Sequence, residues 1–354
     1  MKGLILSGGK GTRLRPLTYT SSKQLVPVAN KPILFYGIEA LADAGIHDIG
    51  IVVGETKEEI KNAVGDGSKW NISITYIEQD EPRGLAHAVL ISESFLGQEP
   101  FVMYLGDNLL AQGIKPFVEE FTENNTAAQI LLAKVPNPER FGVAELNDGK
   151  IVGLVEKPSE PKSDFALVGV YLFSPEIFDS VKQIKFSSRN ELEITDAIQN
   201  LIDRKLIVRP HIVSGWWKDT GKLEDLLEAN QLVLDTLERR IDGDVDNDSS
   251  IEGKVIIEPG AVIKNSVIHG PAAIGTKAHI EHARIGPFTS IMNNVHIRDS
   301  EVENSIVLEG SVIIDLANRV VDSLIGKNVR IYRQQVKASA YRFMLGDNSK
   351  VGIR

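Results

Sequence analysis

The first residues that could do chemistry form a glycine-rich loop near the start of the chain. Residues 7–16 read SGGKGTRLRP. Three glycines let backbone N–H groups approach anionic oxygens closely, and an arginine side chain adds a fixed fork of charged donors. The loop fits neither the dinucleotide fingerprint, because Leu14 stands where the last glycine should be, nor the Walker pattern. It favours polyphosphate binding, with an ordinary glycine-rich turn as the alternative.

A second candidate segment follows directly. Residues 22–28 read SKQLVPV and place Lys23 and Gln24 in an otherwise apolar stretch. Alone, such a pair is typical of solvated surface. Together with the preceding loop, the two segments could close around one triphosphate.

The elements that would position these segments alternate between short β-branched runs and helical patterns up to about residue 239. We expect strands over residues 3–6, 49–53, 72–77 and 101–105, and helices over 32–45, 57–64 and 85–96. This alternation predicts an α/β fold with a Rossmann-like, mostly parallel sheet and helices on both faces. Ligands of such sheets bind at the carboxyl ends of the strands, so we look for chemistry after Leu6 and after Leu105.

A different period begins after an acidic, turn-rich segment, RRIDGDVDNDSS, at residues 239–250. We therefore expect a catalytic domain over 1–239, a linker over 240–250 and a second domain over 251–354. In the second domain, aliphatic residues recur every six positions, and each set starts seventeen residues after the last. The sets are Ile251, Ile257, Ile263; Ile268, Ile274, Ile280; Ile285, Ile291, Ile297; and Val302, Leu308, Ile314.

The repeat breaks at Arg319, and Ile325 and Ile331 rejoin it. Hexapeptide repeats predict a parallel β-helix, whose stacked coils bury a column of aliphatic side chains. An open end of such a solenoid must be capped or buried. We expect the tail at residues 341–345, YRFML, to form that cap or a subunit contact.

The composition excludes several classes of function. The 354 residues are 42% hydrophobic and 25% charged, with a net charge of −9 and no cysteine. Without cysteine there is no disulfide, thiolate nucleophile or cysteine-based zinc site. The apolar stretch at residues 4–6 is too short for a signal peptide, so we expect a cytoplasmic protein. The negative charge argues against a nucleic-acid partner, and no segment predicts a membrane partner.

The motifs together resemble those of the sugar nucleotidylyltransferases. GGxGTRLRPLT is followed by SKQLVPV and NKP, and the Lys-Gln-Leu variant resembles the glucose-1-phosphate thymidylyltransferases. Further matches cover residues 1–239, and the added β-helix is similar to the long form of these enzymes, with a left-handed β-helix. The further matches are EQ at 78–79, PRGLA at 82–86, LGDN at 105–108, RFGV at 140–143, EKP at 156–158, ELEITD at 191–196 and WKDTG at 217–221.

The resemblance implies a role for individual residues. Arg13, Lys23 and Lys157 would be catalytic. The nucleotide would contact Gly8, Gly9, Gly11, Thr12, Arg13, Lys23, Gln24, Gln79, Gly84 and Asp107. The sugar phosphate would contact Asn108, Gly142, Glu156, Lys157 and Val168.

The same resemblance implies a Mg²⁺ site at Asp107 and Asp219. Two carboxylates from distant parts of the chain, facing a polyphosphate, are the hard oxygen ligands that Mg²⁺ prefers. Taken singly, Asp107 could be a strand-ending turn and Asp219 a helix cap. Phe141 and Val168 stand where the family often has Tyr and Thr, so the sugar is less well specified than the reaction.

The implied reaction joins dTTP to glucose 1-phosphate and releases pyrophosphate, for nucleotide-sugar biosynthesis in a homo-oligomer. A uridylyltransferase or an N-acetylhexosamine-1-phosphate enzyme is an alternative. A second, acetyltransferase activity of the β-helix is another, because His269, His279, His282 and His296 lie there. A non-catalytic regulatory subunit is a third, against which the intact candidate residues argue.

Overall fold

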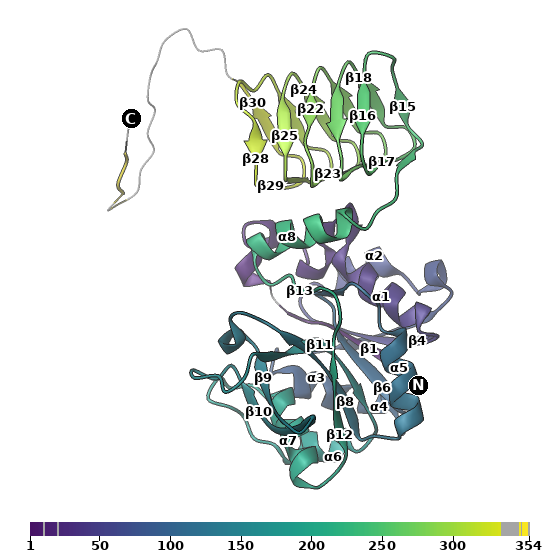
Figure 1. Ribbon diagram of the computed structural model, residues 1–354, viewed down its shortest axis with the longest axis vertical. Coiled ribbons are helices and arrows are strands. Elements are labelled where there is room, and N and C mark those ends of the chain that lie inside the picture. Colours follow the sequence, from purple (N-terminus) through teal and green to yellow (C-terminus); the bar gives the residue numbers. More distant parts are fainter. Residues whose placement is uncertain (10, 20, 334–346, 348, 353–354) are drawn as a thin grey trace.

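The computed structural model describes residues 1–9, 11–19, 21–333, 347 and 349–352, and it places an α/β domain beneath a β-helix (Figure 1). Among these residues, no helix is long and apolar enough to cross a membrane. The predicted cap at 341–345 lies outside the described residues.

The α/β domain is built on a nine-stranded sheet within the described part of the chain, and its main path runs β10-β9-β11-β6-β1-β4-β5. Strands β6, β1, β4 and β5 are parallel, whereas β11 is antiparallel to β6. The strands are β1 (Lys2–Ser7), β4 (Asp48–Val53), β5 (Ser73–Glu78), β6 (Phe101–Leu105), β8 (Ala128–Lys134), β9 (Gly142–Asn147), β10 (Lys150–Glu156), β11 (Phe165–Phe173) and β12 (Val208–Ile212). Two small pairs lie beside it: β2 (Pro27–Val28) with β3 (Lys31–Pro32), and β7 (Asn108–Leu110) with β13 (Trp217–Asp219).

Helices cover both faces of this sheet, as predicted. They are α1 (Ile33–Asp43), α2 (Lys57–Val64), α3 (Leu85–Ile91), α4 (Glu93–Leu96), α5 (Lys115–Asn124), α6 (Ile177–Gln183), α7 (Ile194–Asp203) and α8 (Leu223–Leu234). Helices α1, α2 and α5 pack on one face, and α3, α6 and α7 on the other. The predicted helix over 85–96 is divided at Ser92, whose backbone N–H donates to the carbonyl of Val89 at 3.1 Å and whose hydroxyl donates to that of Ala88 at 2.7 Å.

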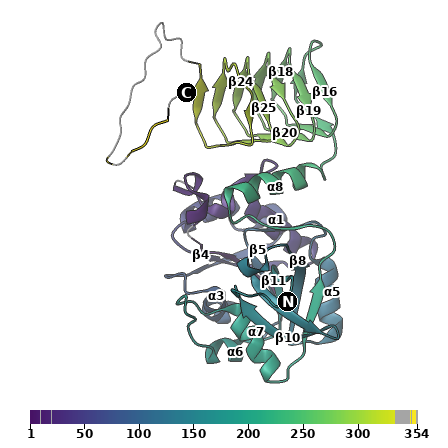
Figure 2. The same ribbon diagram turned by 60° about the vertical axis from the view of Figure 1, so that its left-hand side comes forward.

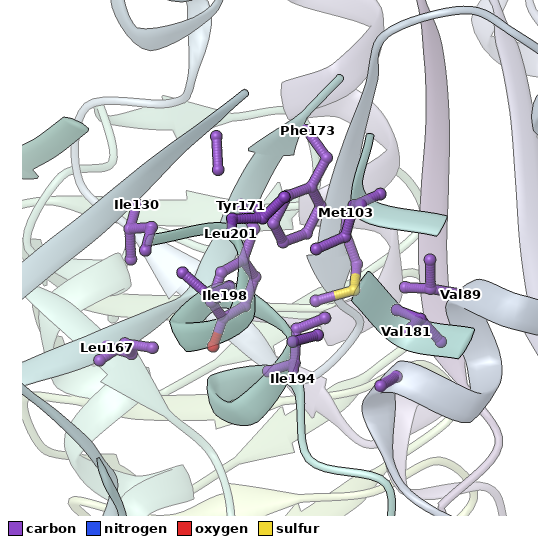
Figure 3. Close-up of a cluster of buried hydrophobic side chains, with 14 of the residues drawn as sticks. Val89, Met103, Ile130, Leu167, Tyr171, Phe173, Val181, Ile194, Ile198 and Leu201 are labelled. Atoms are coloured by element: carbon purple, nitrogen blue, oxygen red, sulfur yellow. The ribbon is translucent and has the colours of Figure 1, made fainter. Parts of the chain in front are cut away.

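Figure 3 shows the core on the second face. Met103 of β6 and Phe173 of β11 lie among Val89 of α3, Val181 of α6 and Ile198 of α7, and all five side chains are buried. Burial of this apolar surface holds the sheet rigid beneath the loops that follow β1 and β6.

The β-helix consists of three parallel sheets whose short strands stack coil upon coil (Figure 2). The first holds β14 (Arg240–Ile241), β17 (Val255–Ile257), β20 (Ala272–Ile274), β23 (Thr289–Ile291), β26 (Ile306–Val307) and β29 (Leu324–Ile325). The second holds β15 (Asp244–Val245), β18 (Val262–Lys264), β21 (His279–Glu281), β24 (His296–Arg298), β27 (Val312–Ile314) and β30 (Arg330–Tyr332). The third holds β16 (Ser250–Glu252), β19 (Val267–His269), β22 (Arg284–Ile285), β25 (Glu301–Glu303) and β28 (Val320–Val321).

The predicted repeat is confirmed for the first three coils and is wrong by one residue in the fourth. Ile257, Ile274 and Ile291 pair in register. The next member of this column is Val307 rather than Leu308, because Val307 pairs with Ile291. In the same way Ile313, not Ile314, pairs with Ile297. The coil is one residue shorter there, which turns Leu308 toward the α/β domain.

The segment predicted as a linker is instead part of the β-helix. Arg240 and Ile241 pair with Ile256 and Ile257, and Asp244 and Val245 pair with Val262 and Ile263. The acidic, turn-rich composition reflects the corners of a first coil. These pairings begin the β-helix at Arg240.

The α/β domain and the β-helix share an apolar contact at α8, which lies between them (Figures 1 and 2). Leu14, Val26 and Leu226 of the α/β domain form one buried cluster with Ile306 and Leu308 of the β-helix. Asn230 of α8 is fully buried beside it, and its side-chain amide donates to the carbonyl of Phe288 at 3.0 Å. The β-helix therefore contacts Leu14 and Val26, which belong to the segment that carries the glycine-rich loop and Lys23.

Candidate active site

The predicted nucleotide-binding residues surround one pocket at the carboxyl ends of β1 and β6. The pocket has a volume of about 330 Å³. All ten of these residues line it: Gly8, Gly9, Gly11, Thr12, Arg13, Lys23, Gln24, Gln79, Gly84 and Asp107. The structure thus brings together five separate sequence segments that the motifs singled out.

The glycine-rich loop turns sharply against the Lys23 segment. Gly11 has φ +62°, and a Cβ at this position would lie 2.9 Å from the Cβ of Lys23, so only glycine fits there. Arg13 is exposed in the short 3₁₀ turn Thr12–Leu14, whereas Lys23 is only 8% exposed. The pocket therefore has one exposed and one buried cation, and these two side chains supply the local positive charge that an acidic protein needs to hold an anion.

The two predicted metal ligands are brought together by the pairing of β7 with β13. Asp219 lies opposite Asn108 in this ladder. The backbone N–H of Thr220 donates to the carbonyl of Asp107 at 3.1 Å, and the Thr220 hydroxyl donates to the same oxygen at 2.8 Å. A Cβ on Gly221 would lie 3.3 Å from Asp219 Oδ2 and 3.6 Å from Arg13 Cζ, so Asp219 also faces the phosphate loop.

The charges of this cluster shift one another's pKa values. The ammonium group of Lys23 donates to the carboxylate of Asp107. Burial opposes the charge on Lys23, but Asp107 and Asp219 outweigh it and raise the pKa of Lys23. Burial also opposes the charge on Asp107, yet Lys23 lowers the pKa of that carboxyl below its usual value. Burial and the nearby Asp107 charge raise the pKa of Asp219 to about 6.

The donor set fits a hard divalent cation. Asp107 and Asp219 supply carboxylate oxygens from two elements, and they face the same loop. Burial and the charge of Asp107 both oppose the charge on Asp219, and a bound dication would favour that charge. Within the described ranges, no group of three or more His, Cys, Asp or Glu side chains could hold a metal ion, so the rest of a coordination shell would come from water and phosphate.

The far end of the pocket is formed by Gln79, at the end of β5, and by Gly84, before α3. Gly84 has φ +102°, and a Cβ there would lie 2.4 Å from the carbonyl oxygen of Leu192. The backbone N–H of Leu192 donates to the carbonyl of Arg83 at 2.8 Å. Gly84 thus lets the 191–196 motif close one wall of the pocket.

The predicted sugar-phosphate residues lie outside the pocket lining and along the antiparallel strands. Glu156 ends β10 opposite Gly142 of β9. Lys157 follows with φ +44°, its side chain is 47% exposed, and its Nζ lies 3.4 Å from a carboxylate oxygen of Glu156. A Cβ on Gly142 would lie 3.2 Å from Glu156 Oε2. These three residues therefore form a second, more open group beside the pocket.

The other two predicted sugar-phosphate residues, Asn108 and Val168, have buried side chains. Asn108 is 2% exposed, and its Oδ1 accepts from Trp217 Nε1 at 2.6 Å and from the Gly169 N–H at 3.2 Å. Its amide also donates to Asp107 Oδ1 at 3.0 Å. The Val168 side chain is fully buried, so only its backbone could face a ligand. The Asn108 side chain thus links the metal-ligand candidates to β11.

Arg189, to which the sequence motifs assign no role, lies beside the predicted sugar-phosphate residue Glu156. Its guanidinium donates to Glu191 Oε2 at 2.7 Å, to Glu193 Oε2 at 3.2 Å and to Glu156 Oε1 at 3.4 Å. Glu191 also lines the nucleotide pocket. The only signal in the sequence was the position of Arg189, two residues before the ELEITD motif.

The histidines of the β-helix are spread over its surface. His279 and His296 are neighbours on β21 and β24, with ring centroids 6.2 Å apart. The Nδ1 of His269 on β19 lies 3.2 Å from Glu252, and that of His282 lies 3.7 Å from Asp299. Three of the four, His269, His279 and His296, are strand residues. A second activity there stays a hypothesis.

A mostly parallel α/β sheet with a glycine-rich loop, two cations and an acidic pair, of which Asp107 lines the pocket, defines a nucleotide-handling domain. The chain belongs to the nucleotidyl transferase family, whose model matches residues 2–236. It is 53% identical over 356 residues to a glucose-1-phosphate thymidylyltransferase of Streptomyces antibioticus, and the match covers 100% of both chains.

Two solved structures resemble the α/β domain. A structure from Bacillus anthracis, assigned as a glucose-1-phosphate thymidylyltransferase in complex with sucrose, has 40% identity and a TM-score of 0.63, covering 66% of this chain and 94% of that one. A UDP-glucose pyrophosphorylase with UDP-glucose has 28% identity and a TM-score of 0.60, covering 66% and 98%. The resemblance inferred from the motifs is confirmed.

Proposed function

We propose that the chain is a glucose-1-phosphate thymidylyltransferase, which converts dTTP and glucose 1-phosphate into dTDP-glucose and pyrophosphate. The observation that carries this proposal is that all ten predicted nucleotide residues line the same pocket. The full-length relative of Streptomyces antibioticus supports the choice of substrates. Residues 1–239 would be the catalytic domain, in agreement with the family match over 2–236.

The mechanism requires positioning and charge neutralisation, and it needs no general base. A phosphate oxygen of the sugar phosphate is already an anionic nucleophile. It forms a bond to the α-phosphorus of dTTP, the bond from this phosphorus to the bridging oxygen breaks, and pyrophosphate leaves with the electron pair. Arg13 and the N–H groups of the glycine-rich loop hold the departing phosphates, and Lys23 neutralises charge at the α-phosphate.

Asp107 and Asp219 would hold Mg²⁺. When bound, the ion supplies Lewis-acid polarisation of the phosphate oxygens. The chain's own part is to keep both carboxylates facing the loop, through Thr220 and the β7–β13 ladder. Lys23, which donates to Asp107, keeps a positive charge beside that site.

On the sugar side, Lys157 would hold the phosphate of glucose 1-phosphate, and Glu156 would accept hydrogen bonds from sugar hydroxyls. Arg189 donates to Glu156 Oε1 at 3.4 Å and brings a further positive charge to this group. The backbones of Gly142 and Val168 would face the hexose. Phe141, 5.3 Å from Trp217 between ring centroids, adds an apolar wall in place of a hydroxyl group.

Uridylyl transfer is the second candidate, and the likeness to a UDP-glucose complex favours it. The side-chain oxygen of Gln79 would accept a hydrogen bond from the ring N–H of either thymine or uracil, so Gln79 does not separate the two bases. Leu6 and Leu85 in the pocket lining offer an apolar surface that a 5-methyl group would contact.

A coupled pyrophosphate-release assay tests the proposal. The full-length protein would be given Mg²⁺ with dTTP, UTP, dCTP or dATP, each with glucose 1-phosphate or N-acetylglucosamine 1-phosphate. We expect the highest kcat/KM with dTTP and glucose 1-phosphate. Preference for another pair would replace the substrate assignment, and no release with any pair would refute the reaction.

We propose further that the β-helix serves assembly of a homo-oligomer, and that the enzyme works in the cytoplasm, where nucleoside triphosphates are available. The apolar contact at α8 supports a structural role for the β-helix. Size-exclusion chromatography with light scattering would test the first statement, and fractionation of cells the second.

A further inference from the structure

The side chain of Gln79 lies at the far end of the pocket, where the base of the nucleotide would bind, and its amide has a defined orientation. A Cβ built on Gly8 would lie 2.8 Å from Oε1 of Gln79, so this oxygen faces the glycine-rich loop and the pocket. The amide nitrogen, Nε2, faces the other way and lies 3.0 Å from Nδ1 of His87. Gln79 lines the pocket, whereas His87 is not among its lining residues.

His87 lies in the first turn of α3 and is half-buried. Because Nε2 of an amide can only donate, Nδ1 of His87 must accept, and the ring proton sits on Nε2 of the imidazole. Desolvation and the charge of Arg83 lower the pKa of His87, and they outweigh Glu81 and Asp80, which act in the opposite direction. The imidazole is therefore neutral at physiological pH and keeps its acceptor.

We propose that His87 is a positioning residue that sets the base specificity of the pocket by holding the Gln79 amide with its oxygen toward the bound base. An oxygen there accepts a hydrogen bond from N3–H, which thymine and uracil possess. Cytosine has an unprotonated N3, whose lone pair would face the lone pairs of the Gln79 oxygen. The inference rests on the proposed function, and in particular on the contact of Gln79 with the base.

The physical basis is the near symmetry of a primary amide. Rotation by 180° about the last side-chain bond exchanges an acceptor for a donor with almost no change of shape. Only the surrounding partners decide which atom faces the pocket. With the acceptor at position 87 removed, the amide can turn its NH₂ group to the pocket and pair with N3 of cytosine.

The test is the ratio of kcat/KM for dTTP to that for dCTP, measured on full-length variants with glucose 1-phosphate. His87→Lys replaces the acceptor by a donor, and we expect the ratio to fall at least about tenfold, on the scale of one hydrogen bond. His87→Glu offers acceptors only, and we expect the ratio to stay within about threefold of wild type. His87→Ala should fall between them.

The ratio of the two kcat/KM values cancels any effect of a substitution that changes both of them equally. Partial unfolding, or the added charge near a triphosphate, changes both rates on the same preparation and cancels. His47→Ala, an exposed histidine outside the pocket lining, is the matched control and should leave the ratio unchanged. Equal ratios in the Lys and Glu variants would overturn the inference.

Gln79→Ala separates this inference from the proposed function. If Gln79→Ala lowers the ratio but the His87 series does not, base reading by Gln79 stands and the role of His87 is wrong. If Gln79→Ala leaves the ratio unchanged, the base contact itself is wrong, and the inference falls with it. A lower ratio in both Gln79→Ala and His87→Lys, with His87→Glu near wild type, supports both.

Discussion

Asn230 of α8 offers the sharpest test of how the β-helix supports the catalytic domain. Its Oδ1 accepts from the backbone N–H of Ala29 at 2.9 Å and from the Ser290 hydroxyl at 2.6 Å. Its Nδ2 donates to the carbonyl of Phe288 at 3.0 Å. One fully buried side chain therefore joins α8, the segment after Lys23 and two residues of the β-helix.

Asn230→Ala would leave the Ala29 N–H and the Phe288 carbonyl without this partner and remove the bond to Ser290. Each loss costs about 1 kcal/mol at such a buried site, so we expect a loss of about 3 kcal/mol in the free energy of unfolding. Because the residue links two parts of the chain, the weakened contact should also divide the unfolding transition into two steps.

Urea denaturation followed by tryptophan fluorescence measures this loss, since Trp216 packs against the cluster shared by the two parts. Asn147→Ala, at an exposed position of β9, is the control and should change stability by less than about 0.5 kcal/mol. Combining Asn230→Ala with Ser290→Ala should give a coupling energy of about 1 kcal/mol. A single transition at the wild-type midpoint in Asn230→Ala would refute the reasoning.

Three further results are expected. Asp107→Asn should lower kcat by about two decades or more with an unchanged circular dichroism spectrum, because it removes a carboxylate that faces the phosphates; near wild-type turnover in saturating Mg²⁺ would exclude the two-carboxylate site. Lys157→Ala should raise the KM for glucose 1-phosphate and lower kcat while calorimetry shows normal dTTP affinity; an equal loss of dTTP binding would place Lys157 on the other ligand. Removal of residues 241–354 should leave measurable thymidylyl transfer but give a less stable, aggregating particle by light scattering, because it bares the Leu14–Val26–Leu226 surface; an inactive truncated protein that is well folded and of unchanged size would mean that the β-helix takes part in catalysis.

Much of the fold could be predicted because local signals agree with the tertiary structure. The run at residues 101–105 and the pattern at 57–64 form β6 and α2 with the predicted bounds. The column Ile257, Ile274 and Ile291 follows directly from the six-residue period. The nucleotide residues could be grouped because their motifs are ordered along the chain, and the structure places all ten around one pocket.

The predictions failed where neighbouring residues are chemically equivalent or where pairing is long-range. Val307 and Leu308 are both aliphatic, so a period alone cannot show that the coil is one residue shorter. The segment at 240–250 has the composition of a linker, and only its pairing with β17 and β18 makes it a coil. Arg189 and His87 could not be assigned, since their contacts with Glu156 and Gln79 join separate segments.

The central claim is that this pocket transfers a nucleotidyl group from a nucleoside triphosphate to a sugar phosphate. The most direct measurement is ³¹P NMR of the full-length enzyme with Mg²⁺, dTTP and glucose 1-phosphate. The account predicts one pyrophosphate and one diphosphate-bridged sugar nucleotide for each dTTP consumed, because the α–β bond breaks. Release of inorganic phosphate from the γ position, or an unchanged spectrum with every nucleotide tested, would contradict it.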